Sequence, residues 1–194
     1  MNTILLGTKN PFKQEKLAEI VAGHFVPFND DTLADVEEVG DSAQEIAEQK
    51  AIAYSKMYDG YAVSTDGGAV IPALPGWNPL HTKRFASSDK ERIETLLEMM
   101  RDAKDRTVEW HEAIALAHRG KLLFSATARA MDGMIDEAFD PKFYREGIWL
   151  CSITSFPQFG GRNYFTLTDE ERAATEDSWF ALREAFVRFQ KEGS

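Results

Sequence analysis

The chain has 194 residues, of which 43% are hydrophobic and 28% charged, a balance typical of an ordinary globular domain. Its formal net charge of −10 argues against binding nucleic acid, because contact with the phosphate backbone needs a basic face. No apolar run reaches the ~18 residues of a membrane-spanning helix, and the first residues lack a signal-peptide pattern. The single cysteine excludes an internal disulfide. We therefore expect a cytoplasmic protein with no membrane contact, forming one domain over residues 1–194.

The first part of the chain alternates short apolar strands with helices. In chain order we predict a strand over 4–8, a helix from Asn10 to about Gly23, a strand over 24–28 and a helix from Ser42 to about Tyr58. Asn10 and Ser42 are typical helix N-caps, because their side-chain oxygens accept hydrogen bonds from free N–H groups of the first turn. Residues 61–65 are typical of a buried strand. We expect Asp66-Gly67-Gly68 to end that strand before it resumes over 69–74.

The second part of the chain contains a hairpin and an amphipathic helix. We predict a loop over 75–86, a helix from Ser88 to about Ala103, strands over 107–118, 121–131 and 148–156, and one helix opened by Thr168 and Glu171. Early alternation of strands and helices, followed by a hairpin, is typical of an α/β fold. We therefore expect a mixed, elongated β-sheet with flanking helices.

The segment Thr8-Lys9-Asn10-Pro11-Phe12-Lys13 lies between the first predicted strand and helix. A helix start presents unpaired N–H groups and the positive end of the helix dipole, so it attracts phosphate. Thr8 and Asn10 can donate hydrogen bonds to phosphate oxygens, and Lys13 adds a positive charge. A capped helix with a solvated lysine explains the same residues, so both interpretations stay open.

Carboxylates suited to a metal ion occur before the second helix and after the strand over 61–65. Glu38 and Asp66 offer the oxygen ligands that Mg²⁺ takes together with water and substrate phosphates. The alternatives are that Glu38 belongs to a solvated loop and that Asp66 belongs to a simple turn. Glu45 and Lys50 are separated by about 140° around a helix, so Glu45 serves the helix cap if Lys50 faces the site.

Taken in order, these segments resemble the inosine-triphosphate pyrophosphatase family. The similar segments are Thr8-x-Asn10-x-x-Lys13 with its (T/S)xNxxK loop, Glu38 to Lys50-Ala51 with ETGxTFxENAxxKA, Thr65-Asp66-Gly67-Gly68 with DDSG, and Ala73 to Phe85 with ALxGxPGxxSaRY. Thr65 stands where the motif has its first Asp. The family's GFGYDPxF and SHR motifs have no good match near 147–152 and 175–179.

The resemblance implies a mixed α/β fold with two lobes around a central cleft, usually as a homodimer. It implies Mg²⁺-dependent hydrolysis of a nucleoside triphosphate, such as ITP or XTP, to the monophosphate and pyrophosphate. On that resemblance, Glu38 and Asp66 bind the metal and act in catalysis. Thr8, Asn10, Lys13 and Lys50 bind the phosphates, and Thr82 and Arg84 contact the substrate. The missing motifs leave two alternatives: a nucleotide-binding sensor without appreciable turnover, and a phosphatase acting on another phosphorylated metabolite.

Overall fold

The structure, a computed structural model, describes residues 1–30, 32, 34–38, 40–81 and 85–192. The chain divides into two compact units, the first formed by 1–67, 111–129 and 178–194 and the second by 68–110 and 130–177. Strands β3 (Tyr61–Val70) and β4 (Thr107–His118) each contribute residues to both units. No helix in these described ranges is long and apolar enough to cross a membrane.

A mixed sheet forms the centre of the first unit. Strand β1 (Asn2–Leu6) pairs in parallel with both β2 (Phe25–Phe28) and β3, while β4 pairs antiparallel with β5 (Lys121–Arg129). Parallel strands need crossover connections. Helix α1 (Pro11–Val21) supplies the crossover from β1 to β2, and α2 (Ala43–Tyr58) supplies the one from β2 to β3.

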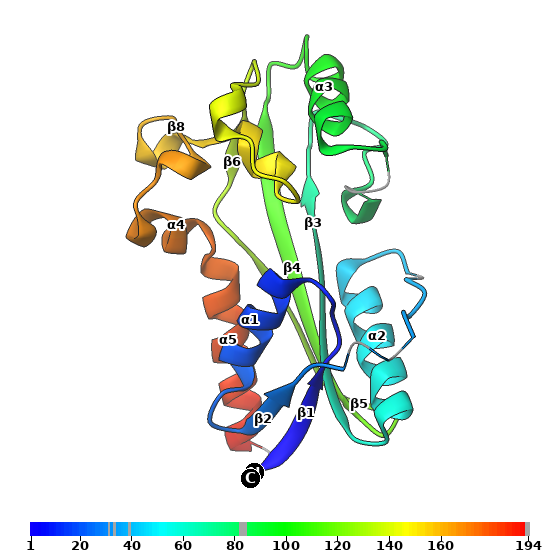
Figure 1. The fold of residues 1–194 in the computed structure, drawn as a ribbon. Helices are drawn as coiled ribbons and strands as arrows, with labels where there is room; N and C mark the ends of the chain where they lie inside the picture. Colours follow the sequence, from blue (N-terminus) through cyan, green and yellow to red (C-terminus); the bar gives the residue numbers. More distant parts are fainter. Residues whose placement is uncertain (31, 33, 39, 82–84, 193–194) are drawn as a thin grey trace. The chain divides into compact units, whose positions relative to one another are not determined.

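Helices cover both faces of this sheet (Figure 1). Helices α1 and α5 (Asp177–Glu192) pack on one face through Leu17, Ile20, Leu182 and Phe186, against Ile4, Val63, Ile114 and Leu116. Helix α2 packs on the other face through Ala47 and Ala51, against Ala113, Ala115 and Ala117.

Side chains alternate between the two faces of a sheet along each strand, so the faces of neighbouring positions on β3 and β4 follow from these contacts. On β4, the even-numbered Ile114 and Leu116 face α1, and so position 112 shares their face. On β3, Val63 faces α1 while Ala62 packs with Tyr54 of α2. Positions 65 and 67 therefore lie on the α1 face, and Asp66 lies on the α2 face.

The second unit combines helices α3 (Asp89–Met99) and α4 (Asp169–Thr175) with short antiparallel strands. The strands are β6 (Gly133–Ile135), which pairs with β4, β7 (Thr154–Phe156) and β8 (Arg162–Asn163). Short 3₁₀ helices span Pro79–His81, Pro141–Phe143, Trp149–Ile153, Pro157–Phe159 and Tyr164–Thr166. Its core contains Ile93, Leu96 and Met100 packed with Trp149 and Ile153.

The mixed α/β class predicted from the sequence is confirmed, but the predicted break in the third strand is wrong. Strand β3 runs through Asp66, Gly67 and Gly68 without interruption, and neither glycine has a positive φ. A Cβ at Gly67 would overlap the Glu112 carboxylate, and one at Gly68 would overlap the backbone carbonyl of Pro79. These glycines therefore provide room for close neighbours and do not turn the chain.

Two further predictions are wrong in the second half of the chain. Residues 148–156 are a 3₁₀ helix, Trp149–Ile153, followed by the short strand β7. This arrangement buries Trp149, Leu150 and Ile153 together, whereas a strand would send neighbouring side chains to opposite faces. The single terminal helix is in fact two helices, α4 and α5, which are separated at Glu176.

Candidate active site

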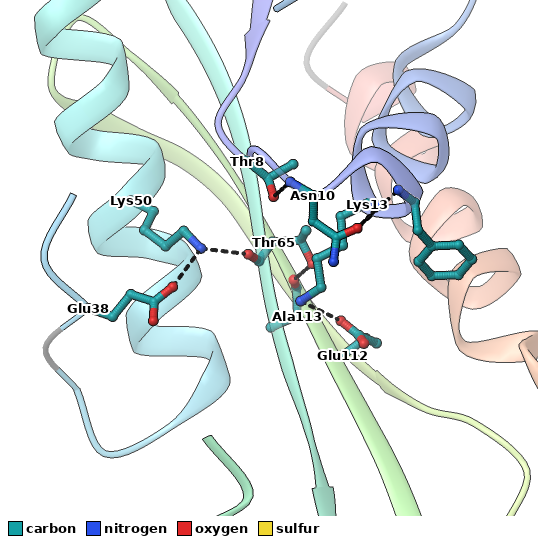
Figure 2. Close-up of polar contacts among 9 residues, drawn as sticks. Thr8, Asn10, Lys13, Glu38, Lys50, Thr65, Glu112 and Ala113 are labelled. Carbon is teal, nitrogen blue, oxygen red and sulfur yellow. Dashed lines mark hydrogen bonds and ion pairs between the residues drawn. The ribbon is translucent and has the colours of Figure 1, made fainter. Parts of the chain in front are cut away.

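The predicted phosphate-binding segment forms the N-terminus of α1 (Figure 2). The Asn10 side-chain oxygen accepts hydrogen bonds from the backbone N–H groups of Phe12 at 3.0 Å and Lys13 at 3.4 Å. The Thr8 hydroxyl accepts one from the Asn10 backbone N–H at 3.3 Å. The predicted N-cap is therefore confirmed. The Asn10 amide NH₂ group and the Thr8 hydroxyl hydrogen take no part in these bonds, which leaves donors for an anion.

Helix α2 brings Lys50 together with Glu38 and the β3 backbone. Lys50 Nζ donates to Glu38 Oε1 at 3.1 Å and to the carbonyl oxygen of Thr65 at 3.3 Å (Figure 2). The Lys50 side chain is only 11% exposed. Glu45 instead accepts a hydrogen bond from the Asp41 backbone N–H at 2.8 Å, and Ser42 caps the Glu45 N–H. As expected, Glu45 therefore serves the helix cap, while Lys50 contacts Glu38 and the β3 backbone.

Asp66 lies within electrostatic reach of both lysines. Burial raises the pKa of Asp66, the charges of Lys13 and Lys50 lower it, and the charge of Glu38 raises it. The structure thus brings together four of the residues selected from the sequence, and they come from α1, α2, the loop before α2 and β3. Thr82 and Arg84 lie outside the described residues.

Glu112 of β4 belongs to the same group, although no sequence motif indicates it. Its Oε2 lies 3.8 Å from Lys13 Nζ, and the two side chains are 18% and 19% exposed. This Oε2 is buried and has no hydrogen-bond partner. Burial raises the pKa of Glu112 to about 7, Lys13 lowers it, and Asp66 raises it. In the sequence, the pattern that could have indicated Glu112 is its place two residues before Ile114 and four before Leu116, where a charged side chain interrupts an apolar strand face.

The raised pKa of Glu112 predicts a pH-dependent stability in metal-free solution. The folded state holds the Glu112 proton more tightly than the unfolded chain does, where the pKa is 4.5. The protonated Glu112 side chain therefore contributes to folding stability below pH 4.5, and this contribution is lost as pH rises through about 7. Urea unfolding with a chelator should therefore show wild type losing stability relative to Glu112→Gln across this range. Glu48→Gln, an equivalent change on α2, should follow wild type. Identical pH profiles for wild type and Glu112→Gln would contradict the prediction.

The fold and these side chains define a class: a mixed α/β protein whose lysines and half-buried carboxylates gather beside a helix N-terminus. Such a combination suits an anionic group that arrives with a cation. The chain belongs to the Ham1 family, whose family model matches residues 4–147. The resemblance to the inosine-triphosphate pyrophosphatase family is thereby confirmed, and the match ends where the sequence departs from the later motifs.

Curated relatives of the chain are named dITP/XTP pyrophosphatases. The Prochlorococcus marinus (strain NATL1A) protein is 33% identical over 108 residues, which are 56% of this chain and 54% of the relative, so the chain spans about half of that relative's length. The Legionella pneumophila (strain Lens) protein is 33% identical over 172 residues, 81% of this chain and 88% of the relative. A solved HAM1 protein from Coxiella burnetii has a TM-score of 0.82 and 23% identity over 97% of this chain and 100% of that chain, which supports the fold.

Proposed function

We propose that this protein hydrolyses a non-standard purine nucleoside triphosphate, of the kind in its relatives' names, to the monophosphate and pyrophosphate. The observation that carries the proposal is the grouping of Lys13, Lys50, Glu38, Asp66 and Glu112 beside the N-terminus of α1. Lysines and the donors left on Thr8 and Asn10 suit a triphosphate, and carboxylates suit the divalent cation that accompanies it.

The donor set fits a divalent cation that is held jointly with the substrate. Within the described ranges, no three His, Cys, Asp or Glu side chains form a complete metal site. Mg²⁺ does not need one, because it commonly uses one or two carboxylates, waters and substrate phosphates. The buried Glu112 Oε2 has no hydrogen-bond partner, and the charge of Asp66 raises the pKa of Glu112, a repulsion that a bound cation would relieve. We assign Glu38 and Asp66 to this cation.

When bound, Mg²⁺ would neutralise phosphate oxygens and orient the attacking water. The other steps use the chain's own residues. Water attacks the α-phosphorus, the bond from that phosphorus to the bridging oxygen breaks, and pyrophosphate leaves. Asp66 takes the proton of the water, and burial, which raises the Asp66 pKa, makes it a better proton acceptor. Lys13, Lys50 and the positive end of the α1 dipole stabilise the charge that builds on the leaving pyrophosphate.

A panel of nucleotides tests this proposal. Purified protein with Mg²⁺ is incubated with dITP, XTP, ITP, ATP and GTP, and both pyrophosphate and orthophosphate are measured. We expect pyrophosphate from dITP, ITP and XTP at a kcat/KM at least about tenfold above that for ATP and GTP, and none when a chelator is present. Binding without turnover would favour the sensor, and orthophosphate alone would favour a phosphatase. The homodimer, the cytoplasmic location, the single domain and the substrate contacts of Thr82 and Arg84 stay predictions.

A further inference from the structure

Lys13 and Glu112 face each other beside the N-terminus of α1 (Figure 2). Lys13 lies in the first turn of that helix, and Glu112 lies on the face of β4 whose next members, Ile114 and Leu116, pack against α1 and α5. Lys13 Nζ and Glu112 Oε2 are 3.8 Å apart, too far for a hydrogen bond but close enough for an ion pair. Because the two side chains are only 19% and 18% exposed, solvent screens the attraction between their charges poorly.

Packing fixes the carboxylate of this pair more firmly than the ammonium. A Cβ built on Gly67 of β3 would overlap the carboxylate carbon and both carboxylate oxygens of Glu112, so the carboxylate lies directly against that backbone. Glu112 Oε2 is buried and has no hydrogen-bond partner. Lysine, in contrast, carries its charge at the end of a flexible four-carbon stem. We therefore expect the Lys13 ammonium, and not the Glu112 carboxylate, to move when a ligand binds.

The second lysine of the site is held differently. Lys50 Nζ donates to Glu38 Oε1 at 3.1 Å and to the carbonyl oxygen of Thr65 at 3.3 Å, so two hydrogen bonds fix it. Lys13 meets its carboxylate only at ion-pair distance. Of the two lysines, Lys13 is therefore the one that a phosphate at the N-terminus of α1 can recruit with the smaller loss of existing bonds.

Recruiting Lys13 leaves Glu112 in an unfavourable state. Its buried Oε2 loses the opposite charge, and removing one partner of a poorly hydrated ion pair is costly. The charge of Asp66 adds to this cost, because it disfavours the ionised form of Glu112 and raises the pKa of Glu112. A phosphate ligand must therefore offset the loss of this ion pair before it gains Lys13.

We propose that Glu112 is a positioning residue that holds Lys13 until substrate binds, competes with the substrate phosphates for the Lys13 ammonium, and so lowers the affinity for the triphosphate. This inference rests on the proposed function, because the competing anion is a nucleoside triphosphate. It concerns Lys13 alone and assigns no cation to Glu112. An ion pair that serves only the fold would change the free energy of unfolding but would leave nucleotide affinity unchanged.

The affinity is measured by calorimetry with a non-hydrolysable α,β-methylene analogue of ITP, in the presence of a chelator so that no cation contributes. At pH 8, above the Glu112 pKa of about 7, the wild-type carboxylate is charged. We expect Glu112→Gln to bind the analogue about tenfold more tightly than wild type. The control Glu48→Gln, whose carboxylate accepts hydrogen bonds from Ser125 and Gln44, should bind it as wild type does. Equal or weaker binding by Glu112→Gln would overturn the inference, as would a failure of both wild type and Glu112→Gln to bind.

A double-mutant cycle decides whether Glu112 acts through Lys13. In a Lys13→Ala background, Glu112→Gln should change the affinity by less than about twofold, because no ammonium remains to be held and Glu112 then takes up a proton more readily. If the full gain persists in that background, Glu112 repels the phosphates directly and the inference fails.

A second substitution covers the case in which Glu112→Gln does not fold. Glu112→Met keeps the length of the side chain on an otherwise apolar strand face, and it should show the same gain in affinity. Unchanged affinity in that variant would equally overturn the inference. Pyrophosphate release by wild type decides the proposed function separately, since these affinities are measured without turnover.

Discussion

Asp66→Asn is expected to lower kcat for pyrophosphate release by about 10³-fold or more. The amide keeps the shape of the side chain on β3, but it removes the negative charge that would bind the cation and the group that would take the proton. Because burial already disfavours the charged form and raises the Asp66 pKa, the neutral amide should not destabilise the folded state. Steady-state kinetics with dITP and Mg²⁺ measure the change in kcat, and thermal unfolding checks the fold.

The matched control is Asp59→Asn at the C-cap of α2. Asp59 has a left-handed backbone conformation with φ of 56°, which asparagine also tolerates. This control makes the same chemical change in the same compact unit, on an exposed side chain, so its kcat should equal that of wild type. If Asp66→Asn also kept full activity, Asp66 would have no part in the reaction.

Lys13→Ala is expected to raise KM for the triphosphate about 10²-fold, with a smaller change in kcat. Lys13 lies in the first turn of α1 and is only 19% exposed, so its charge is poorly screened by solvent. Its removal should also raise the pKa of Glu112 further, since Lys13 is the strongest influence that lowers it. Glu112 would then take up a proton near neutral pH, which limits the loss of folding stability.

Lys16→Ala is the comparison for this experiment. Lys16 also belongs to α1, but its ammonium lies over the Phe12 ring at 5.3 Å from the centroid. Its loss should leave KM near that of wild type. Binding of the non-hydrolysable analogue, measured by calorimetry, should weaken in Lys13→Ala and not in Lys16→Ala. Equal KM and equal affinity in both variants would remove the α1 N-terminus from phosphate binding.

Much of the secondary structure follows from local patterns. The N-caps predicted at Asn10, Ser42, Ser88 and Thr168 are all confirmed, and each side chain accepts a hydrogen bond from the first turn of its helix. Capping succeeds as a predictor because both partners lie within three residues of each other along the chain. The alternation of strands and helices likewise predicted the mixed α/β class, since apolar periodicity reflects which faces are buried.

The errors share a different cause. Asp66-Gly67-Gly68 resembles a turn, and only the approach of Glu112 and Pro79 shows that these glycines continue a strand. The hydrophobic pattern of residues 148–156 does not distinguish a strand from a 3₁₀ helix. Packing around Trp149 selects the 3₁₀ helix over Trp149–Ile153. The division between α4 and α5 falls at Glu176, which accepts a hydrogen bond from the Tyr164 hydroxyl at 2.6 Å. Each outcome depends on a neighbour that is distant in the chain or on local packing.

The amino-acid order alone was enough to establish the capped helix starts, the fold class and the selection of Lys13, Glu38, Lys50 and Asp66 as one set of candidates. Their grouping, and the entry of Glu112 into it, came only with the folded chain. The reason is physical: capping and periodicity act between residues a few positions apart, whereas burial and charge coupling depend on which strands become neighbours. Glu112 lies 46 positions beyond Asp66 in the sequence, yet each is within reach of the charge on Lys13.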